Sequence, residues 1–325
     1  RALHGTTKLE ALRRAADAAH AIRQAGAAGI AVADWAMDWD KVRAAVGQAA
    51  EDAAPEAEAA RFRGMGIEVV HAPAHFVAPD ALSAGGRVWR FRRCVLATGS
   101  APALPVVPGL AEIPFLSPDT LPDLESAPGH LLVLGDDAPA LEAAQSYRRL
   151  NCLVTLIAPG SLLPAEDPEL VSVLRNALRR EGIAVLEGHA VARAESDPAG
   201  ITLLLADGRR VTGSHLFLSG AMTPRTAALD LSVGRVDAGP GGIETRPDLR
   251  STTNRRVWAA GSVAAPAAGA AGLGAGADHL PLLVRSMIFR LPARPGAGPR
   301  PFLTGTDPAL LRIGPTTAPP GGLTL

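Results

Sequence analysis

The sequence predicts an α/β protein with parallel βαβ units, and three observations support this fold class. Between residues 129 and 188, apolar strands alternate with helical stretches of about 10–15 residues, the spacing typical of βαβ units. The stretch VLGDDAPALEAA, from Val133 to Ala144, has the outline of a dinucleotide-binding turn that opens a helix. The segments RRCVLATG and RVWAAGS each indicate a strand that runs into a glycine turn.

Length and charge limit the classes of function. A chain of 325 residues favours two domains. The 32 basic residues balance the 32 acidic residues and form no basic run, so we expect neither nucleic acid nor a membrane as a partner. The apolar runs are shorter than the roughly 18 residues of a membrane helix. The chain starts at Arg1 without a signal-peptide pattern, so we expect a cytoplasmic protein and a sequence cut from a longer one.

The first part of the chain is predicted to be helical and then extended. Residues 8–28 place apolar side chains at helical spacing, and a charged, Ala-rich second helical tract covers residues 39–63. Residues 66–77 alternate like strands, and residues 87–99 indicate a strand and a glycine turn. Seven prolines in residues 101–130 argue against regular structure there and predict a connection between domains.

The second part of the chain supplies the βαβ pattern. The expected elements are a strand at 130–135, a helix at 138–150, a strand at 153–159, a helix at 167–182, a strand at 183–188, a hairpin at 201–220 and a strand at 256–262. Asp207-Gly208 is the predicted hairpin turn. The low-complexity residues 264–277 are assigned no structure, and a last helix is expected at 279–291.

The turn at Gly135 departs from the dinucleotide-binding pattern at one position. Gly135 and Ala140 supply the first and third small residues, but Asp137 stands in place of the second glycine. A carboxylate about 4 Å from a phosphate costs on the order of 4 kcal/mol at an effective dielectric of 20. Asp137 is also a favoured helix N-cap, and Pro139 suits the first turn. Two interpretations stay open: Asp137 replaces the phosphate at this helix end, or a rearranged nucleotide site still works.

The two cysteines and eight histidines give no sign of a metal or disulfide site. Cys94 and Cys152 lie far apart in apolar segments, outside any C-x-x-C spacing, and are predicted to be buried, reduced thiols. The histidines are scattered without ligand spacing, so no metal site is expected.

Several separated stretches together resemble one enzyme family. Residues 93–110 resemble the ATG turn of the FAD-dependent pyridine nucleotide-disulfide oxidoreductases, and residues 131–187 resemble their nicotinamide-nucleotide domain. Residues 219–263 are similar to a family turn followed by the A-A-G-D flavin strand, and residues 288–296 and 301–316 resemble the entry to the dimerisation domain. Within the family, the sequence is most similar to mercuric reductases and dihydrolipoamide dehydrogenase-like members.

The resemblance implies two Rossmann-like domains, with the NAD(P) domain inserted in the FAD domain. It assigns residues 1–128 to a partial FAD-binding segment that includes the turn at 97–100. Residues 129–246 would form the NAD(P)-binding domain, and residues 247–292 the second FAD-binding segment. Residues 293–325 would begin a truncated dimerisation domain.

The resemblance also implies cofactor-binding residues. For FAD these are Ala74, Thr98, Gly99, Ser100, Gly261 and Ser262. For NAD(P) they are Gly135, Asp137, Ala140, Glu142, Ala158, Val191 and Gly220.

Some of these positions carry a second interpretation. Ser262 stands where the family has Asp, so it would be a weaker acceptor for the flavin ribityl chain. Glu142 would lie near the nicotinamide or be an ordinary solvated helix charge. The turn from Thr98 to Ser100 would be needed as a domain crossover even without flavin. Ala158 is neither acidic nor basic, which leans slightly toward NADPH.

The implied activity is hydride transfer from NAD(P)H through FAD to a disulfide or a thiol-bound metal, by a homodimer. This sequence has no redox cysteine pair, no N-terminal glycine turn for the ADP half of FAD and no C-terminal His segment, so no catalytic residue is assigned. Truncation of a longer enzyme and a natural pseudoenzyme are both considered. The alternative function is a degenerate, non-catalytic Rossmann module with a structural or partner-binding role.

Overall fold

The computed structural model describes residues 2–52, 59–198, 200–265, 275–294 and 301–314. The chain forms two compact units, each of which is described by itself. The first unit contains residues 1–58, 104–220 and 299–325, and the second contains residues 59–103 and 221–298. Within the described residues, no helix has the length and apolar character that crossing a bilayer requires.

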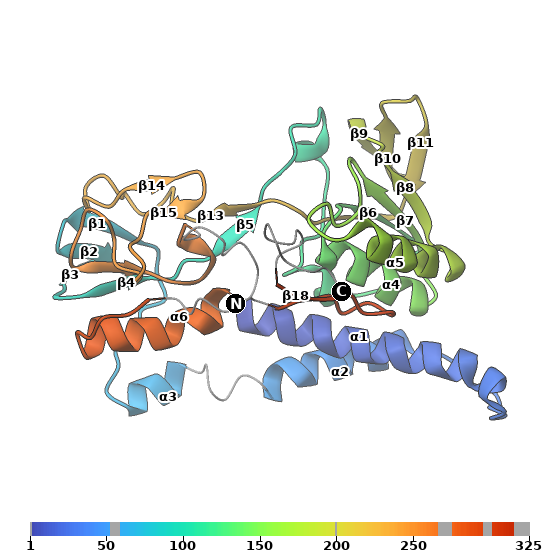
Figure 1. Ribbon diagram of the computed structural model, residues 1–325, viewed down its shortest axis with the longest axis horizontal. Helices are drawn as coiled ribbons and strands as arrows, with labels where there is room; N and C mark the ends of the chain where they lie inside the picture. Colours follow the sequence, from blue (N-terminus) through green and yellow to red (C-terminus); the bar gives the residue numbers. More distant parts are fainter. Residues whose placement is uncertain (1, 53–58, 199, 266–274, 295–300, 315–325) are drawn as a thin grey trace, which may run out of the picture. The chain divides into compact units, whose positions relative to one another are not determined.

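A four-stranded parallel sheet forms the centre of the first unit, in the order β12-β6-β7-β8. Its strands are β6 (His130–Leu134), β7 (Leu153–Ala158), β8 (Ala184–Glu187) and β12 (His215–Leu218). Helices α4 (Ala138–Arg149) and α5 (Pro168–Arg180) connect β6 to β7 and β7 to β8 (Figure 1). Most residues of β6 and β7 are buried, as expected for parallel strands covered on both faces. The sheet and its crossover helices confirm the predicted α/β class.

The rest of the first unit surrounds this sheet. Helix α1 (Ala2–Gln24), with the short 3-10 turn η1 (Ala25–Ala28), packs against α2 (Trp39–Asp52) and α4. An antiparallel sheet contains β9 (Val191–Asp197), β10 (Gly200–Leu205) and β11 (Arg210–Gly213). The remaining elements are η2 (Leu110–Glu112), η3 (Leu121–Asp123), β17 (Pro301–Leu303) and β18 (Leu311–Ile313). The largest core cluster joins Leu12 of α1, Val46 of α2 and Tyr147 of α4.

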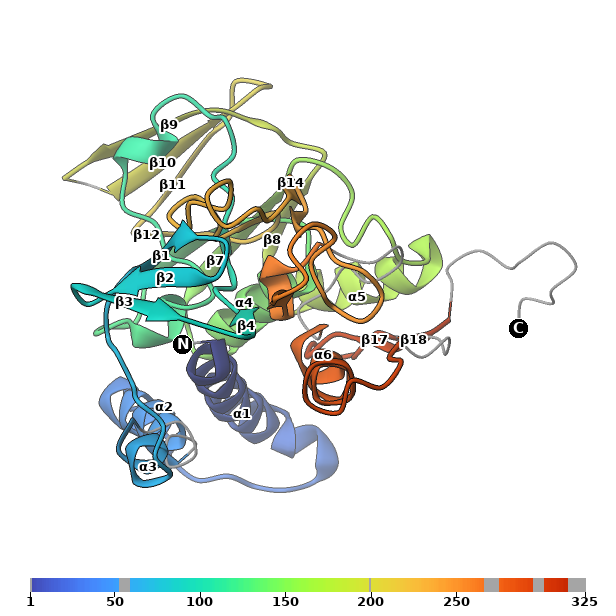
Figure 2. The same ribbon diagram turned by 90° about the vertical axis from the view of Figure 1, so that its left-hand side faces the viewer.

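The second unit is built from small sheets. Strands β1 (Ala74–Ala78), β2 (Ala81–Ala84) and β3 (Arg87–Arg90) form an antiparallel meander (Figure 2). The other strand pairs are β4 (Cys94–Leu96) with β16 (Val257–Ala259), β5 (Ser100–Pro102) with β13 (Met222–Pro224), and β14 (Ala238–Gly239) with β15 (Gly242–Ile243). Its helices are α3 (Ala59–Gly64), η4 (Gly261–Val263), α6 (Ala275–Leu283) and the π-helical turn η5 (Val284–Ile288).

Some sequence predictions differ from the structure. The proline-rich residues 101–130 are not free of regular structure, because they include part of β5 and two 3-10 turns. Pro102 is tolerated in β5 because this strand belongs to an isolated two-stranded pair, where a missing N–H costs little. Strand β9 was not expected, and of residues 66–77 only the last four are in a strand. Residues 53–58 of the predicted second helical tract and residues 266–274 of the low-complexity stretch lie outside the described residues.

The compact units do not end at the predicted domain boundaries. Residues 221–246, predicted to close the NAD(P) domain, belong to the second unit. The reason is the pairing of β13 with β5, which places Met222 opposite Pro102. Residues 1–58, predicted to belong to an FAD segment, belong to the first unit, since α1 packs against α4. Which cofactor each unit holds stays a prediction.

Candidate functional site

Two loops of the second unit are brought side by side by a parallel strand pair. Strands β4 and β16 align Cys94 with Val257 and Leu96 with Ala259, so the loops that follow them leave the same edge. The hydroxyl of Ser100 donates a hydrogen bond to the carbonyl oxygen of Ser262 at 2.8 Å. We call residues 97–100 and 260–262 the flavin-side loops, after the resemblance that predicts their role.

Each flavin-side loop contains a glycine with open space beside its backbone. Gly99 and Gly261 have φ angles of 72° and 73°, in the left-handed region that favours glycine. Among the described residues, a Cβ atom at Gly261 would meet nothing within 4 Å, and one at Gly99 would meet only Ser262 Oγ at 3.9 Å. A flat ligand could therefore approach the main chain closely at both glycines.

His279, for which no role was predicted, supports the flavin-side loop at residues 260–262. The Nδ1 atom of His279, on α6, accepts a hydrogen bond from the backbone N–H of Gly261 at 3.0 Å. His279 is buried, so this hydrogen bond attaches the loop to α6. No spacing rule could have found it, because the two residues are 18 positions apart and lie on different elements. The hydroxyl of Thr98 is also engaged and donates to the carbonyl oxygen of Arg225 at 2.8 Å.

The turn between β6 and α4 in the first unit is tightly closed. A Cβ atom at Gly135 would lie 2.8 Å from the carbonyl oxygen of Ser219 and 3.1 Å from Ala140 Cβ. Gly135 and Ala140 are therefore small because the end of β12 and the start of α4 approach each other here. Gly220 follows Ser219 directly and has a φ of 133°.

Asp137 caps helix α4, as predicted. Its Oδ1 atom accepts hydrogen bonds from the backbone N–H of Ala140 at 3.1 Å and from the hydroxyl of Ser219 at 2.6 Å. Free N–H groups at a helix N-terminus are the donors that bind phosphate in dinucleotide sites. One of these donors is occupied by the protein's own carboxylate. Ser219 directly follows β12 and lies 82 residues from Asp137, and its contact with Asp137 was not predicted.

A second carboxyl group, that of Asp136, and the ends of β7 and β8 lie next to this cap. Burial, and then the charge of Asp137, raise the pKa of Asp136 above its usual value. The carbonyl oxygen of Ala158, at the end of β7, accepts a hydrogen bond from the N–H of His189 at 3.1 Å. His189 lies two residues before Val191, so the end of β7 lies beside the loop that leads into β9.

Glu142 is not the solvated helix charge that one interpretation expected. Its carboxylate is half-buried and accepts a hydrogen bond from the backbone N–H of Gly305 at 2.7 Å. Burial raises the pKa of Glu142, and only in part do the Gly305 N–H and the charge of Arg13 oppose that rise. These contacts neither support nor contradict its predicted position near a nicotinamide, which stays a prediction.

Nine of the thirteen predicted cofactor-binding residues fall into two groups. The structure gathers Gly135, Asp137, Ala140 and Gly220 around Ser219, and it gathers Thr98, Gly99 and Ser100 around Gly261 and Ser262. Ala74 begins β1 in a separate antiparallel sheet, where it pairs with Ala84.

The two cysteines are free thiols, one in each unit. Cys94 is half-buried, Cys152 is buried, and both are unpaired. Burial raises the pKa of each thiol to about 11, so both are protonated at neutral pH. In the part of the chain that the structure describes, no group of three His, Cys, Asp or Glu side chains is placed to hold a metal.

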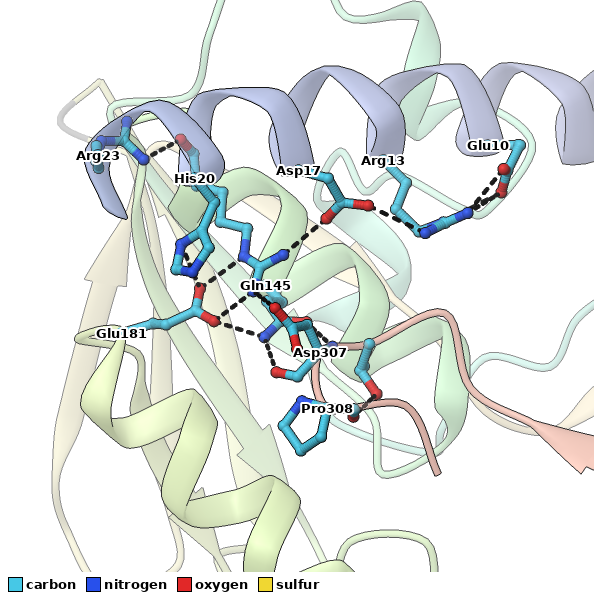
Figure 3. A network of polar contacts seen from close by, with 11 residues as sticks. Glu10, Arg13, Asp17, His20, Arg23, Gln145, Glu181, Asp307 and Pro308 are labelled. Carbon is cyan, nitrogen blue, oxygen red and sulfur yellow. Dashed lines mark hydrogen bonds and ion pairs between the residues drawn. The ribbon is translucent and has the colours of Figure 1, made fainter. Parts of the chain in front are cut away.

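An ion cluster in the first unit holds the segment after β17, which we call the C-terminal segment, against α4 (Figure 3). The guanidinium of Arg149 lies 2.7 Å from carboxylate oxygens of Asp17 and Glu181 and 2.9 Å from Asp307. Arg149 is 4% exposed, so it is a buried charge held by three carboxylates. These residues come from α1, α4, the end of α5 and the segment after β17, which sequence reasoning had no means to connect.

Comparison with known proteins agrees with this architecture. The family model described as "Pyridine nucleotide-disulphide oxidoreductase" matches residues 9–284. A mercuric reductase of Streptomyces lividans is 34% identical over 206 residues, which cover 61% of this chain and 44% of that protein. A mercuric reductase of Acidithiobacillus ferrooxidans is 34% identical over 203 residues, covering 62% of this chain and 35% of that protein.

Solved structures show the same fold at lower sequence identity. The flavoprotein disulfide reductase RclA of Escherichia coli, as its Cu(II) complex, has a TM-score of 0.81 at 18% identity and covers 96% of this chain and 68% of its own. LpdA of Mycobacterium tuberculosis has a TM-score of 0.81 at 20% identity, with 96% and 69% of the two chains covered.

The fold and the two loop regions thus define an FAD/NAD(P) Rossmann-like protein. The chain belongs to the pyridine nucleotide-disulphide oxidoreductase family, whose members are oxidoreductases that depend on FAD and NAD(P). The predicted family resemblance and fold class are confirmed. The chain spans between a third and a half of the length of these two mercuric reductases.

Proposed function

We propose that this chain provides the cofactor-binding framework of an NAD(P)H-dependent flavoprotein oxidoreductase. In the whole protein, the hydride of NAD(P)H would pass through FAD to a disulfide or to a metal ion held by thiols. The observation that carries the proposal is the pairing of β4 with β16, which sets the flavin-side loops together at one edge. Family membership supports the same reaction class.

The flavin-side loops fit FAD. Gly99 and Gly261 leave open space beside their backbones, and the N–H of Gly261 is held in place by His279. We assign Thr98, Gly99, Ser100, Gly261, Ser262 and Ala74 to FAD. When bound, FAD would supply a two-electron acceptor. The task of these residues is to orient the ligand and present backbone groups to it.

The turn at α4 does not fit a pyrophosphate in the described arrangement. Asp137 holds the N–H of Ala140 and the hydroxyl of Ser219, so a phosphate would have to displace a carboxylate and meet its charge. We propose that Gly135, Asp137, Ala140, Glu142, Ala158, Val191 and Gly220 mark the NAD(P) site of the family, and that Asp137 weakens it here. The absence of an acidic residue at Ala158 leans toward NADPH over NADH.

We further propose that these 325 residues alone do not reduce a disulfide. The sequence contains only Cys94 and Cys152, and burial raises the pKa of both thiols to about 11. The nucleophile in thiol–disulfide exchange is a thiolate, so a protonated, buried thiol is a poor one. The whole enzyme would be a cytoplasmic homodimer.

A second candidate function is a non-catalytic Rossmann module with a structural or partner-binding role. The self-capped start of α4 favours it, because Asp137 satisfies that helix end without a nucleotide. Flavin binding separates the two candidates, since only the first requires it.

Titration of the purified chain with FAD, followed by flavin fluorescence, tests the proposal. We expect saturable binding that Ser262→Asp tightens about 5-fold, because a charged acceptor is stronger than a neutral one. Ser232→Asp, at an exposed serine of the same unit, is the control and should leave the affinity unchanged. Absence of saturable binding by the wild type and by Ser262→Asp would favour the non-catalytic module.

A further inference from the structure

Five arginines gather at the end of the second unit's parallel strand pair that is opposite the flavin-side loops. Arg92 and Arg93 directly precede β4, and Arg255 lies two residues before β16. Because Cys94 aligns with Val257, the amino ends of both strands meet at one edge. Arg250 and Arg290 line the same hollow. We call it the arginine pocket.

The arginine pocket has a fixed wall and a defined size. Its volume is about 470 Å³, within the range of about 300–1,000 Å³ typical of small-ligand sites. Trp258, which is 5% exposed, donates its indole N–H to the hydroxyl of Ser286 at 3.1 Å. Ser286 in turn donates to the carbonyl oxygen of Asp248 at 2.9 Å. The first bond joins β16 to the helical turn η5, and the second joins η5 to Asp248, so three segments that line the pocket are held together.

The charges in the arginine pocket are not balanced. Asp248 is the one carboxylate in its lining, and its Oδ2 atom lies 3.9 Å from Arg250 Nε, beyond hydrogen-bond distance. Arg250 Nε is buried and has no hydrogen-bond partner among the described residues. The other four arginines of the pocket form no ion pair with a described carboxylate. The adjacent Arg256, by contrast, pairs with Asp80 at 3.1 Å.

We propose that the arginine pocket binds a ligand that carries two or more phosphate groups. The chain as a whole has no net charge, so this local excess of positive charge is specific to the pocket. Guanidinium groups present donors in a fork that matches phosphate oxygens, and several forks facing one hollow suit a diphosphate better than a single phosphate. A bound polyanion also relieves the mutual repulsion of the arginines. The proposal does not depend on the flavin or nicotinamide sites.

Isothermal titration with inorganic pyrophosphate at constant ionic strength tests this site in the intact chain. We expect saturable binding, weakened at least ~10-fold by the double variant Arg93→Ala/Arg255→Ala, since each charge-assisted bond contributes strongly to affinity. The matched control is Arg61→Ala/Arg63→Ala, which removes two exposed arginines from α3 of the same unit. Its affinity should stay within about 2-fold of the wild type. Circular dichroism confirms that each variant folds.

Three results would overturn the proposal. The first is a wild-type signal no larger than that of chloride at the same ionic strength. The second is equal weakening in the pocket and control variants, which would indicate general electrostatic attraction. The third is saturable binding of a poly-glutamate peptide without binding of pyrophosphate, which would indicate an acidic protein partner. If the double variant does not fold, Arg255→Gln replaces it, because Arg255 is exposed and its loss leaves no partner unpaired.

Discussion

The turn before α4 and the flavin-side loops each follow a strand and contain a glycine. They differ in which atoms lie next to the backbone of that glycine. At α4, the protein's own groups fill the space: Ser219 crowds Gly135, and Asp137 takes the N–H of Ala140. At the flavin-side loops, nothing described lies within 4 Å of a Cβ atom placed on Gly261. In the first unit the turn after β6 is therefore filled by the protein's own groups, and we call it the closed junction. In the second unit the flavin-side loops leave space beside glycine, and we call them the open junction.

The largest expected effect is the loss of folding stability when the ion cluster around Arg149 of α4 is broken. Arg149→Met would leave the carboxylates of Asp17, Glu181 and Asp307 without their shared cation (Figure 3). Breaking a buried pair costs about 3–5 kcal/mol, and we expect about 3 kcal/mol because two of these carboxylates are partly exposed. Urea denaturation measures the loss.

A surface arginine provides the control for this variant. Arg43→Met removes a guanidinium from α2 whose partner Asp40 is largely exposed, so we expect less than about 0.5 kcal/mol. Equal losses from Arg149→Met and Arg43→Met would contradict a buried cluster that fastens the C-terminal segment to α4.

A pair of glycine substitutions sharpens the contrast between closed and open junctions. Gly135→Ala places a methyl group 2.8 Å from a carbonyl oxygen, and such overpacking should cost about 2 kcal/mol. Gly261→Ala meets no atom of a described residue within 4 Å, so it should cost only the strain of its φ of 73°, about 1 kcal/mol. Thermal or urea unfolding of both variants gives the order, and a larger loss at Gly261 would reverse our description of the two junctions.

The smallest effect is a pH dependence at Glu142. Burial raises the pKa of this carboxyl in the folded state, so its contribution to stability is complete below its ordinary value of 4.5 and is lost as pH rises through the raised pKa. Glu142→Gln keeps an acceptor for the N–H of Gly305 without the charge. The variant should therefore be more stable than the wild type at pH 7, by about 1 kcal/mol or less, and equal to it near pH 4. A variant less stable at pH 7 would show that the charge itself is needed.

How much the sequence predicts depends on how local the determining contacts are. The cap at Asp137 and the βαβ order follow from neighbouring residues, and both were predicted correctly. The antiparallel pair of β5 and β13 was missed, because prolines in both strands hide the strand pattern and the partners are far apart in sequence. Ser219, His279 and the cluster around Arg149 were missed for the same reason, since each acts on a residue of another element.

The measurement that most directly tests the closed junction is an NADPH titration of the wild type and of Asp137→Gly. Glycine is tolerated at an N-cap, so the variant should stay folded and bind NADPH at least ~10-fold more tightly once the carboxylate is removed. Asp167→Gly, which removes the N-cap of α5 in the same way, should change nothing. Micromolar binding by the wild type that Asp137→Gly leaves unchanged would contradict a helix end filled by its own side chain.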